Sequence, residues 1–265
     1  MSCSLGERGR VGYASNRSMK TYASRAAPRL FAPVDLPLGT EIQLPDRVAR
    51  HLAVLRLAAG DAITLFDGRG GEFAAELTRV SSKHVRARVL SKLSLERESP
   101  LCILLAQCIS SGDRMDTTLQ KSTELGVSRI VPVASERSVV RLSGERAEKR
   151  VAHWRNVVVA ACEQCGRNRI PEVFEITPIS DFLGSAERDG LRLLLAPDGE
   201  RKLAGLTPPG GVTLLVGPEG GLTARERQNT ERAGFIPVRF GPRVLRTETA
   251  PLAVIAAMQT LWGDC

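Results

Sequence analysis

Glycines, arginines and carboxylates gather in two loops near the carboxyl end of the chain. The first loop, Gly217 to Gly221, follows the apolar run Val212 to Val216 and precedes a helix that Thr223 can cap. The second loop, Gly241 to Glu248, follows a strand-like run at 235–240 and leads into the last helix. Glycine lets a backbone approach a ligand closely, and open α/β sheets bind ligands where strands end. These loops therefore predict a binding site built largely from backbone groups.

An isolated glycine-rich pentamer such as Gly217 to Gly221 can also be no more than a tight turn. The second loop favours a site, because two successive strand-to-helix connections carry the same kinds of residue. Neither loop is a G-x-G-x-x-G or G-x-x-x-x-G-K-[ST] nucleotide motif. A nicotinamide oxidoreductase is disfavoured, because the first glycine loop comes at the end of the domain and not after its first strand.

Gly217-Pro-Glu-Gly-Gly221 with Leu245-Arg-Thr-Glu-Thr-Ala250 resembles the two carboxy-terminal signature loops of the SPOUT-type 16S ribosomal RNA uracil-N3 methyltransferase family. The resemblance covers residues 28 to 265 and includes four upstream segments, which are Gly112–Asp116, Gln120–Val127, Ser135–Val139 and Glu163–Arg167. It implies a PUA-like RNA-binding β-barrel at 28–95. An α/β methyltransferase domain with a mostly parallel sheet and a trefoil knot would follow at 100–265. Residues 1–27 would be a disordered or non-native extension.

The activity that the resemblance implies is methylation of uridine N3 in 16S ribosomal RNA of the small subunit, with S-adenosyl-L-methionine as donor. Methyl transfer is an in-line displacement, so holding the nucleophile close to the methyl carbon supplies most of the catalysis. N3 must also lose a proton. Arg246 is a candidate to stabilise the resulting anion, and Glu248 or Glu219 to accept the proton. The sequence does not rank the two carboxylates.

The expected site residues fall into three groups. The catalytic residues are Arg246 and Glu248. The donor-binding residues are Leu195, Gly217, Pro218, Glu219, Gly220, Gly221, Leu245, Arg246 and Thr247. The RNA-binding residues are Arg56, Arg86, Arg137, Arg141, Gln164 and Arg167. The family associates the last four of these RNA-binding residues with the RNA-facing side of the site. The first two belong to the β module, where cations between Lys83 and Val89 line one face of a strand, a pattern that a solvated edge strand also shows.

Two other functions fit parts of this pattern. A SPOUT ribose 2′-O-methyltransferase would share the fold and differ in its nucleophile. A non-catalytic RNA-binding or ribosome-assembly protein would explain the charge and the barrel, but it would leave the two carboxy-terminal loops without a task.

The composition of the chain limits which partners, compartments and metal sites are expected. The formal charge of +8 favours a polyanionic partner, although residues 1–28 hold five cations against one acid and so supply half of the excess. The six cysteines are scattered, which favours a cytoplasmic protein over a disulfide scaffold, and no apolar run suggests a membrane span. Cys162 and Cys165 have C-x-x-C spacing without a second ligand pair, so no metal is expected.

The final helix, expected at Glu248 to Trp262, is apolar on nearly all sides. A helix without a polar face must be buried all round. Its own sheet can cover one stripe, and SPOUT enzymes resemble one another in pairing through this region. The expected assembly is a homodimer with Leu261 and Trp262 at or near the interface.

Overall fold

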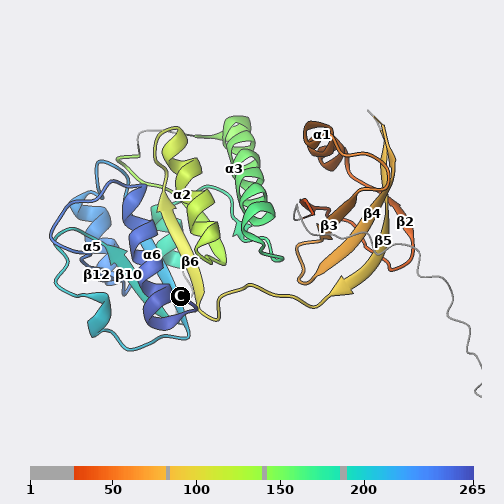
Figure 1. The fold of residues 1–265 in the computed structure, drawn as a ribbon. Coiled ribbons are helices and arrows are strands. Elements are labelled where there is room, and N and C mark those ends of the chain that lie inside the picture. Colours follow the sequence, from red (N-terminus) through yellow and green to blue (C-terminus); the bar gives the residue numbers. More distant parts are fainter. Residues whose placement is uncertain (1–26, 82–83, 139–141, 186–189) are drawn as a thin grey trace, which may run out of the picture.

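The computed structural model describes residues 27–81, 84–138, 142–185 and 190–265, which form two domains (Figure 1). Leu95 to Pro100 connects the domains without helix or strand. In the described residues, no helix is long and apolar enough to cross a membrane.

The amino-terminal domain is a five-stranded sheet with the order β1-β3-β4-β5-β2. Its elements are β1 (Arg29–Phe31), β2 (Glu41–Gln43), α1 (Asp46–Leu55), β3 (Ala62–Phe66), β4 (Glu72–Val80) and β5 (Val85–Leu93). Only β1 pairs in parallel, and the other ladders are antiparallel. No ladder joins the two ends of this order within the described residues.

Strand β5 confirms the alternation that its sequence predicts. Val85, Ala87 and Val89 are buried in the core of the amino-terminal domain, whereas Arg86 and Arg88 between them are exposed. Successive side chains of a strand point to opposite faces, so one face of β5 is apolar and the other is basic.

The carboxy-terminal domain contains a parallel sheet with the order β12-β10-β11-β6-β7-β8, and β9 also pairs with β7. The strands are β6 (Cys102–Cys108), β7 (Arg129–Ala134), β8 (Glu172–Val173), β9 (Thr177–Pro178), β10 (Leu191–Leu195), β11 (Gly211–Val216) and β12 (Ile236–Val238). The helices are α2 (Asp113–Glu124), α3 (Gly144–Cys165), α4 (Ile179–Ser185), η1 (Leu203–Gly205), α5 (Ala224–Arg232) and α6 (Thr249–Trp262). The α/β class and the largely parallel sheet after a PUA-like domain are confirmed.

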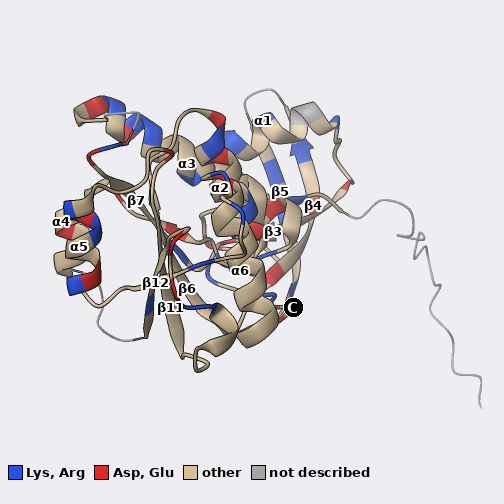
Figure 2. Ribbon diagram, turned by 90° about the vertical axis from the view of Figure 1, so that its left-hand side faces the viewer, with Lys and Arg blue, Asp and Glu red and all other residues tan. Residues whose placement is uncertain are grey.

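Helices cover both faces of this sheet (Figure 2). Helices α2, α3 and α6 lie on one face, where Ile103 and Leu105 of β6 pack in a core with Trp154. Helices α4 and α5 lie on the other face, where Ala106 of the same strand packs in a core with Phe182. A strand buried on both faces reads as a continuous apolar run, which explains why β6 and β11 lack alternation in the sequence.

Strand order brings three loops to one edge. Strands β6, β11, β10 and β12 are neighbours and run in parallel, so the segments after β6, β11 and β12 leave the sheet at the same edge. These segments are 109–112, 217–223 and 239–248. Binding at the carboxyl edge of parallel strands is therefore possible although the loops are far apart in sequence.

The connection between the domains is fixed along its length. Asn168 donates to the Leu95 carbonyl at 2.5 Å, and Glu96 accepts from the Gly71 amide at 2.7 Å. Arg97 donates to the Gly166 carbonyl at 2.9 Å. Two further bonds, of Glu98 to Arg167 and of Ser99 to Gln259, reach the carboxy-terminal domain. The segment Leu95 to Pro100 is thus a bonded strap between the domains.

Candidate functional site

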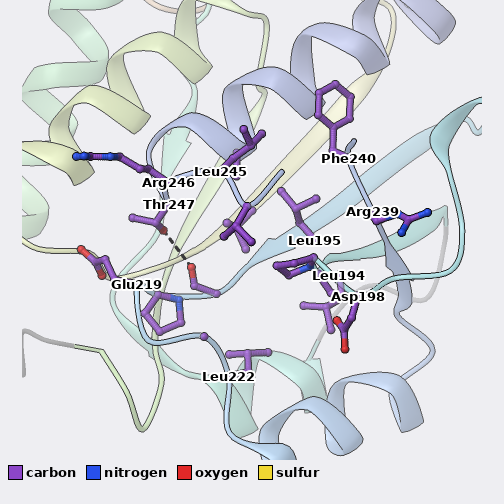
Figure 3. A pocket seen from close by; sticks show the side chains of 18 of the residues that line it. Leu194, Leu195, Asp198, Glu219, Leu222, Arg239, Phe240, Leu245, Arg246 and Thr247 are labelled. Carbon is purple, nitrogen blue, oxygen red and sulfur yellow. Dashed lines mark hydrogen bonds between the residues drawn. The ribbon is translucent and has the colours of Figure 1, made fainter. Parts of the chain in front are cut away.

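A cavity of about 600 Å³ opens where the three loops meet. Its walls are the ends of β10 and β11 and the loops that follow β11 and β12, with Arg114 of α2 at one side. Figure 3 shows side chains from these segments around the cavity, with Glu219 and Arg246 toward one end and Asp198 toward the other.

The loop after β11 is a turn that leads into a capped helix. The Gly221 amide donates to the Pro218 carbonyl at 2.8 Å, and Gly221 has a φ of 65°, which favours glycine. Thr223 caps α5 as its sequence predicts: its hydroxyl accepts from the Glu226 amide at 3.2 Å, and Glu226 accepts from the Thr223 amide at 2.8 Å. The rigid start of α5 holds the glycine loop in place.

Thr247 attaches the second loop to the first. The side chain is buried, and its hydroxyl donates to the Gly217 carbonyl at 3.1 Å (Figure 3). The same hydroxyl accepts from the amide nitrogen of Gln107, at the end of β6, at 3.4 Å. The two loops and β6 are therefore joined beneath the cavity.

Glu219 is held by a set of donors. Its Oε1 accepts from the Ser111 amide at 3.1 Å, from the Ser111 hydroxyl at 3.2 Å and from Arg114 at 3.1 Å. Burial raises the pKa of this carboxyl, but the backbone amides of Glu219 and Ser111 and the Arg114 guanidinium outweigh it. The pKa of Glu219 therefore lies below its ordinary value, and the group is an ionised acceptor.

Glu248 lies on the other side of the same arginine. Its Oε2 is 3.9 Å from Nε of Arg114, and this oxygen is buried without a hydrogen bond. Arg246, two residues earlier, is exposed and lines the cavity with its neighbours. One cation thus faces two carboxylates from different loops.

The far end of the cavity is apolar with one ion pair. Leu195 and Phe240 line its wall, and the Arg227 guanidinium donates to the Asp198 carboxylate at 2.5 and 2.6 Å. That hydrogen bond lowers the pKa of Asp198 below its ordinary value. Four residues of the cavity were not predicted from the sequence: Arg114, Asp198, Arg227 and Phe240. They could have been identified by their position, because each lies next to a strand end or at the start of the next helix, on the edge where parallel sheets bind ligands.

The expected donor-binding residues meet at this cavity with one exception. Leu195, Gly217, Pro218, Glu219, Gly221, Leu245, Arg246 and Thr247 line it, as does the expected catalytic residue Glu248. Gly220 does not, and a Cβ there would lie 3.4 Å from the Cβ of Arg137. The Arg137 guanidinium in turn donates to the Gly220 carbonyl at 3.0 Å. Gly220 therefore contacts an expected RNA-binding residue on the outer side of the loop.

The expected RNA-binding residues are dispersed. Arg56, Arg86 and Gln164 are exposed, and Arg141 is outside the described residues. Arg56 ends α1 with a φ of 56°, an uncommon conformation for a residue other than glycine. Arg86 pairs with Glu41 at 3.1 Å across the sheet. Of this group, Arg137 is the residue that contacts a loop of the cavity.

The structure overturns the expected RNA-binding role of Arg167. Its side chain is 5% exposed, and it donates to the carbonyls of Thr123 at 2.9 Å and Val127 at 2.8 Å. It also pairs with Glu98 of the strap. A guanidinium that is enclosed and bonded on all sides does not face RNA. The sequence assigns Arg167 to a segment that the family associates with RNA. It does not tell in which direction the chain turns after Gly166, which caps α3.

Comparisons with known proteins show the family of this chain. The family described as "RNA methyltransferase domain" matches residues 97–259, and the family "RNA methyltransferase PUA domain" matches residues 44–90. The chain belongs to this RNA methyltransferase family. A protein of Buchnera aphidicola subsp. Acyrthosiphon pisum named "Ribosomal RNA small subunit methyltransferase E" is 31% identical over 91% of this chain and 96% of its own. The protein of that name in Bacillus subtilis is 32% identical over 83% and 91%.

Solved structures show the same architecture. A ribosomal RNA small subunit methyltransferase E from Neisseria gonorrhoeae, bound to S-adenosyl methionine, has a TM-score of 0.88 and 49% identity over 90% of this chain and 99% of its own. A putative methyltransferase of Legionella pneumophila, also in complex with this cofactor, has a TM-score of 0.88 and 40% identity over 91% and 100%. The two-domain fold is therefore one that these two proteins share with this chain.

Proposed function

We propose that this protein transfers a methyl group from S-adenosyl-L-methionine to N3 of a uridine in 16S ribosomal RNA. The observation that carries the proposal is the cavity, because both signature loops build it in a chain 49% identical to a relative bound to this donor. Its volume of about 600 Å³ is typical of small-molecule sites. A ribosomal RNA substrate also implies a cytoplasmic location.

The residues of the cavity suit a donor with an apolar ring and a charged tail. Leu195, Phe240 and Leu245 supply apolar surface for the adenine ring, and the backbone around Gly217 supplies close-fitting polar groups. The bound donor contributes a methyl carbon activated by a sulfonium. The chain contributes position and charge, and Arg246 at the cavity is the candidate to stabilise negative charge on the uracil ring.

The RNA would be positioned by cations outside the cavity. Arg86 and Arg88 form the basic face of β5, and Arg137 lies against the glycine loop. Contacts of this kind bind phosphate and fix the register of the substrate without reading its sequence. The expected role of Arg56 and Gln164, both exposed, is of the same kind.

The proposed assembly is a homodimer through α6. Leu261 is 46% exposed, and Leu252, Ala253 and Ala256 are only partly buried, so the residues that the structure describes leave one stripe of this apolar helix uncovered. Light scattering should give about twice the chain mass of 28.7 kDa. Trp262→Glu should produce a monomer and reduce methylation, whereas a wild-type monomer at micromolar concentration contradicts the proposal.

Nucleoside mass spectrometry of treated small-subunit RNA tests the reaction. N3-methyluridine supports the proposal, and a 2′-O-methylated nucleoside would assign the ribose instead. A thermal shift with S-adenosyl-L-methionine separates the enzyme from a non-catalytic RNA-binding protein, because a ligand that binds the folded state raises the melting temperature.

A further inference from the structure

Two carboxylates of the cavity compete for one arginine. Arg114, in the first turn of α2, reaches Glu219 after β11 with one terminal nitrogen at 3.1 Å. Its Nε faces Glu248, the residue before α6, at 3.9 Å. The side chains of Glu219 and Glu248 are 22% and 20% exposed, so they are shielded from water to the same extent. Burial therefore does not distinguish the two groups.

Their hydrogen bonds do distinguish them. Glu219 Oε1 accepts three hydrogen bonds, from the Ser111 amide, the Ser111 hydroxyl and Arg114. Glu248 Oε2 accepts none, although it is buried. A buried polar atom without a partner is unfavourable, and in a residue that lines a cavity a bound ligand is one group that can supply the partner. A carboxylate oxygen that already accepts three hydrogen bonds has little capacity left to take a proton, whereas the carboxylate of Glu248 has an oxygen without any donor.

We infer that Glu248 takes the N3 proton of the uridine and that Arg114 is the positioning residue that holds Glu219 in the loop and leaves Glu248 open. This inference rests on the proposed function and deepens it. Among the described residues, the charged group that faces Glu248 is Arg114, and Arg114 also pairs with Glu219.

The proposed step balances as follows. The N–H bond at N3 breaks, and its proton goes to the Glu248 carboxylate, which lines the cavity. The electron pair left on N3 forms the bond to the methyl carbon. The bond between that carbon and sulfur breaks, its electron pair stays on sulfur, and the sulfonium becomes a neutral thioether. Glu248 then returns the proton to solvent.

Three variants and one control test the inference. Glu248→Gln and Glu219→Gln each replace a carboxylate by an amide of the same shape. Arg114→Lys keeps the charge but has one nitrogen, which cannot reach both carboxylates. Arg146→Gln, at an exposed position of α3, is the matched control for loss of a cation. The readouts are kcat at saturating donor and RNA, donor affinity by calorimetry, and thermal unfolding without donor.

Glu248→Gln should lower kcat by about a hundredfold or more while donor affinity and melting temperature stay unchanged. Its rate should recover about tenfold per pH unit above neutrality, because the N3 anion then forms in solution without a base. A lost structural contact would not produce that recovery. Glu219→Gln should instead lower the melting temperature and weaken donor binding, with a smaller loss of kcat.

Arg114→Lys should lower kcat by about tenfold to a hundredfold, because a small misplacement of reacting groups has effects of that size. Combined with Glu219→Gln, it should add little to the drop in melting temperature, since the two residues act as one unit. Additive drops overturn the role of Arg114 whatever the reaction is. A wild-type kcat in Glu248→Gln, or a larger loss in Glu219→Gln, overturns the assignment of the proton. If the wild-type chain makes no N3-methyluridine, the proposed function fails and the proton assignment fails with it.

Discussion

Replacing Arg167 by methionine should unfold this protein at a markedly lower temperature. The side chain is 5% exposed and donates to the Thr123 and Val127 carbonyls at 2.9 and 2.8 Å. It also pairs with Glu98, whose side chain is 21% exposed. Methionine fills a similar volume without a donor. It therefore leaves one carboxylate and two carbonyl oxygens without their partner, and the loss is electrostatic more than steric.

The size of the effect follows from these contacts. Removing one member of a buried ion pair costs about 3–5 kcal/mol, because the remaining charge has no compensation. The partial exposure of Glu98 reduces this value, while the two lost carbonyl bonds increase it. With a net loss of about 4 kcal/mol and roughly 2–4 °C per kcal/mol for a domain of this size, the melting temperature should fall by about 8–16 °C.

Differential scanning calorimetry of Arg167→Met, Arg167→Lys and Gln164→Ala measures this difference. Gln164 is exposed on the same segment, so its variant should melt within about 1 °C of the wild-type chain. Lysine should give an intermediate drop, because it keeps the charge but cannot reach all three acceptors. An unchanged melting temperature in Arg167→Met, together with weaker RNA binding, would refute the structural role and restore an RNA-facing one.

Three further outcomes are expected. Leu195→Trp should fill part of the cavity and weaken donor binding at least about tenfold, measured by calorimetry. Gly220→Val should leave donor affinity unchanged, because its side chain would meet Arg137 outside the cavity. Equal losses of donor affinity in both variants would contradict the placement of the donor in this cavity. Arg88→Ala, which removes one exposed cation of β5, should weaken RNA binding and reduce the slope of log K against log salt by about 1, and an unchanged slope would exclude a phosphate contact. The pKa of Glu219 is lowered in the folded chain, so its ionised carboxylate should stabilise the fold above the ordinary carboxyl pKa of about 4.3, and this stabilisation should be lost as the pH falls through the lower pKa of the folded state. The melting temperature of Glu219→Gln should therefore approach that of the wild-type chain at acidic pH. A difference in melting temperature that stays constant between pH 7 and 3 would count against the hydrogen bonds described for Glu219.

The parts of the site that sequence could predict are those that depend on local patterns. Thr223 with Glu226 is a capping pair that can be read directly, and the apolar run before Gly217 marks a strand end. Strand β5 shows the same agreement, because alternation along one strand is a local property. The short strand β1 was missed, since its three residues gain their partners from distant β3.

The parts that sequence could not predict depend on contacts between distant segments. Gly220 and Gly221 are adjacent and chemically identical, yet one faces Arg137 and the other lines the cavity. Arg114 reaches Glu219 across more than a hundred residues, because β6 and β11 are neighbours in the sheet. The family resemblance named the segments that matter, and only the structure shows which side chain of each segment faces the cavity, the partner loop or the core.

Arg167 shows why a buried residue can still influence how RNA is bound. It anchors Glu98, and the residues on either side of Glu98 in the strap are bonded as well, Arg97 to the Gly166 carbonyl and Ser99 to Gln259 of α6. On the other side, Glu96 accepts from the Gly71 amide and Arg97 pairs with Glu72, both in the amino-terminal domain. The strap therefore fixes the basic face of β5 relative to the cavity. A change at Arg167 would weaken the anchor of the strap without altering any residue of the basic face of β5, so variants at this position should lower RNA affinity in step with the stability that they lose.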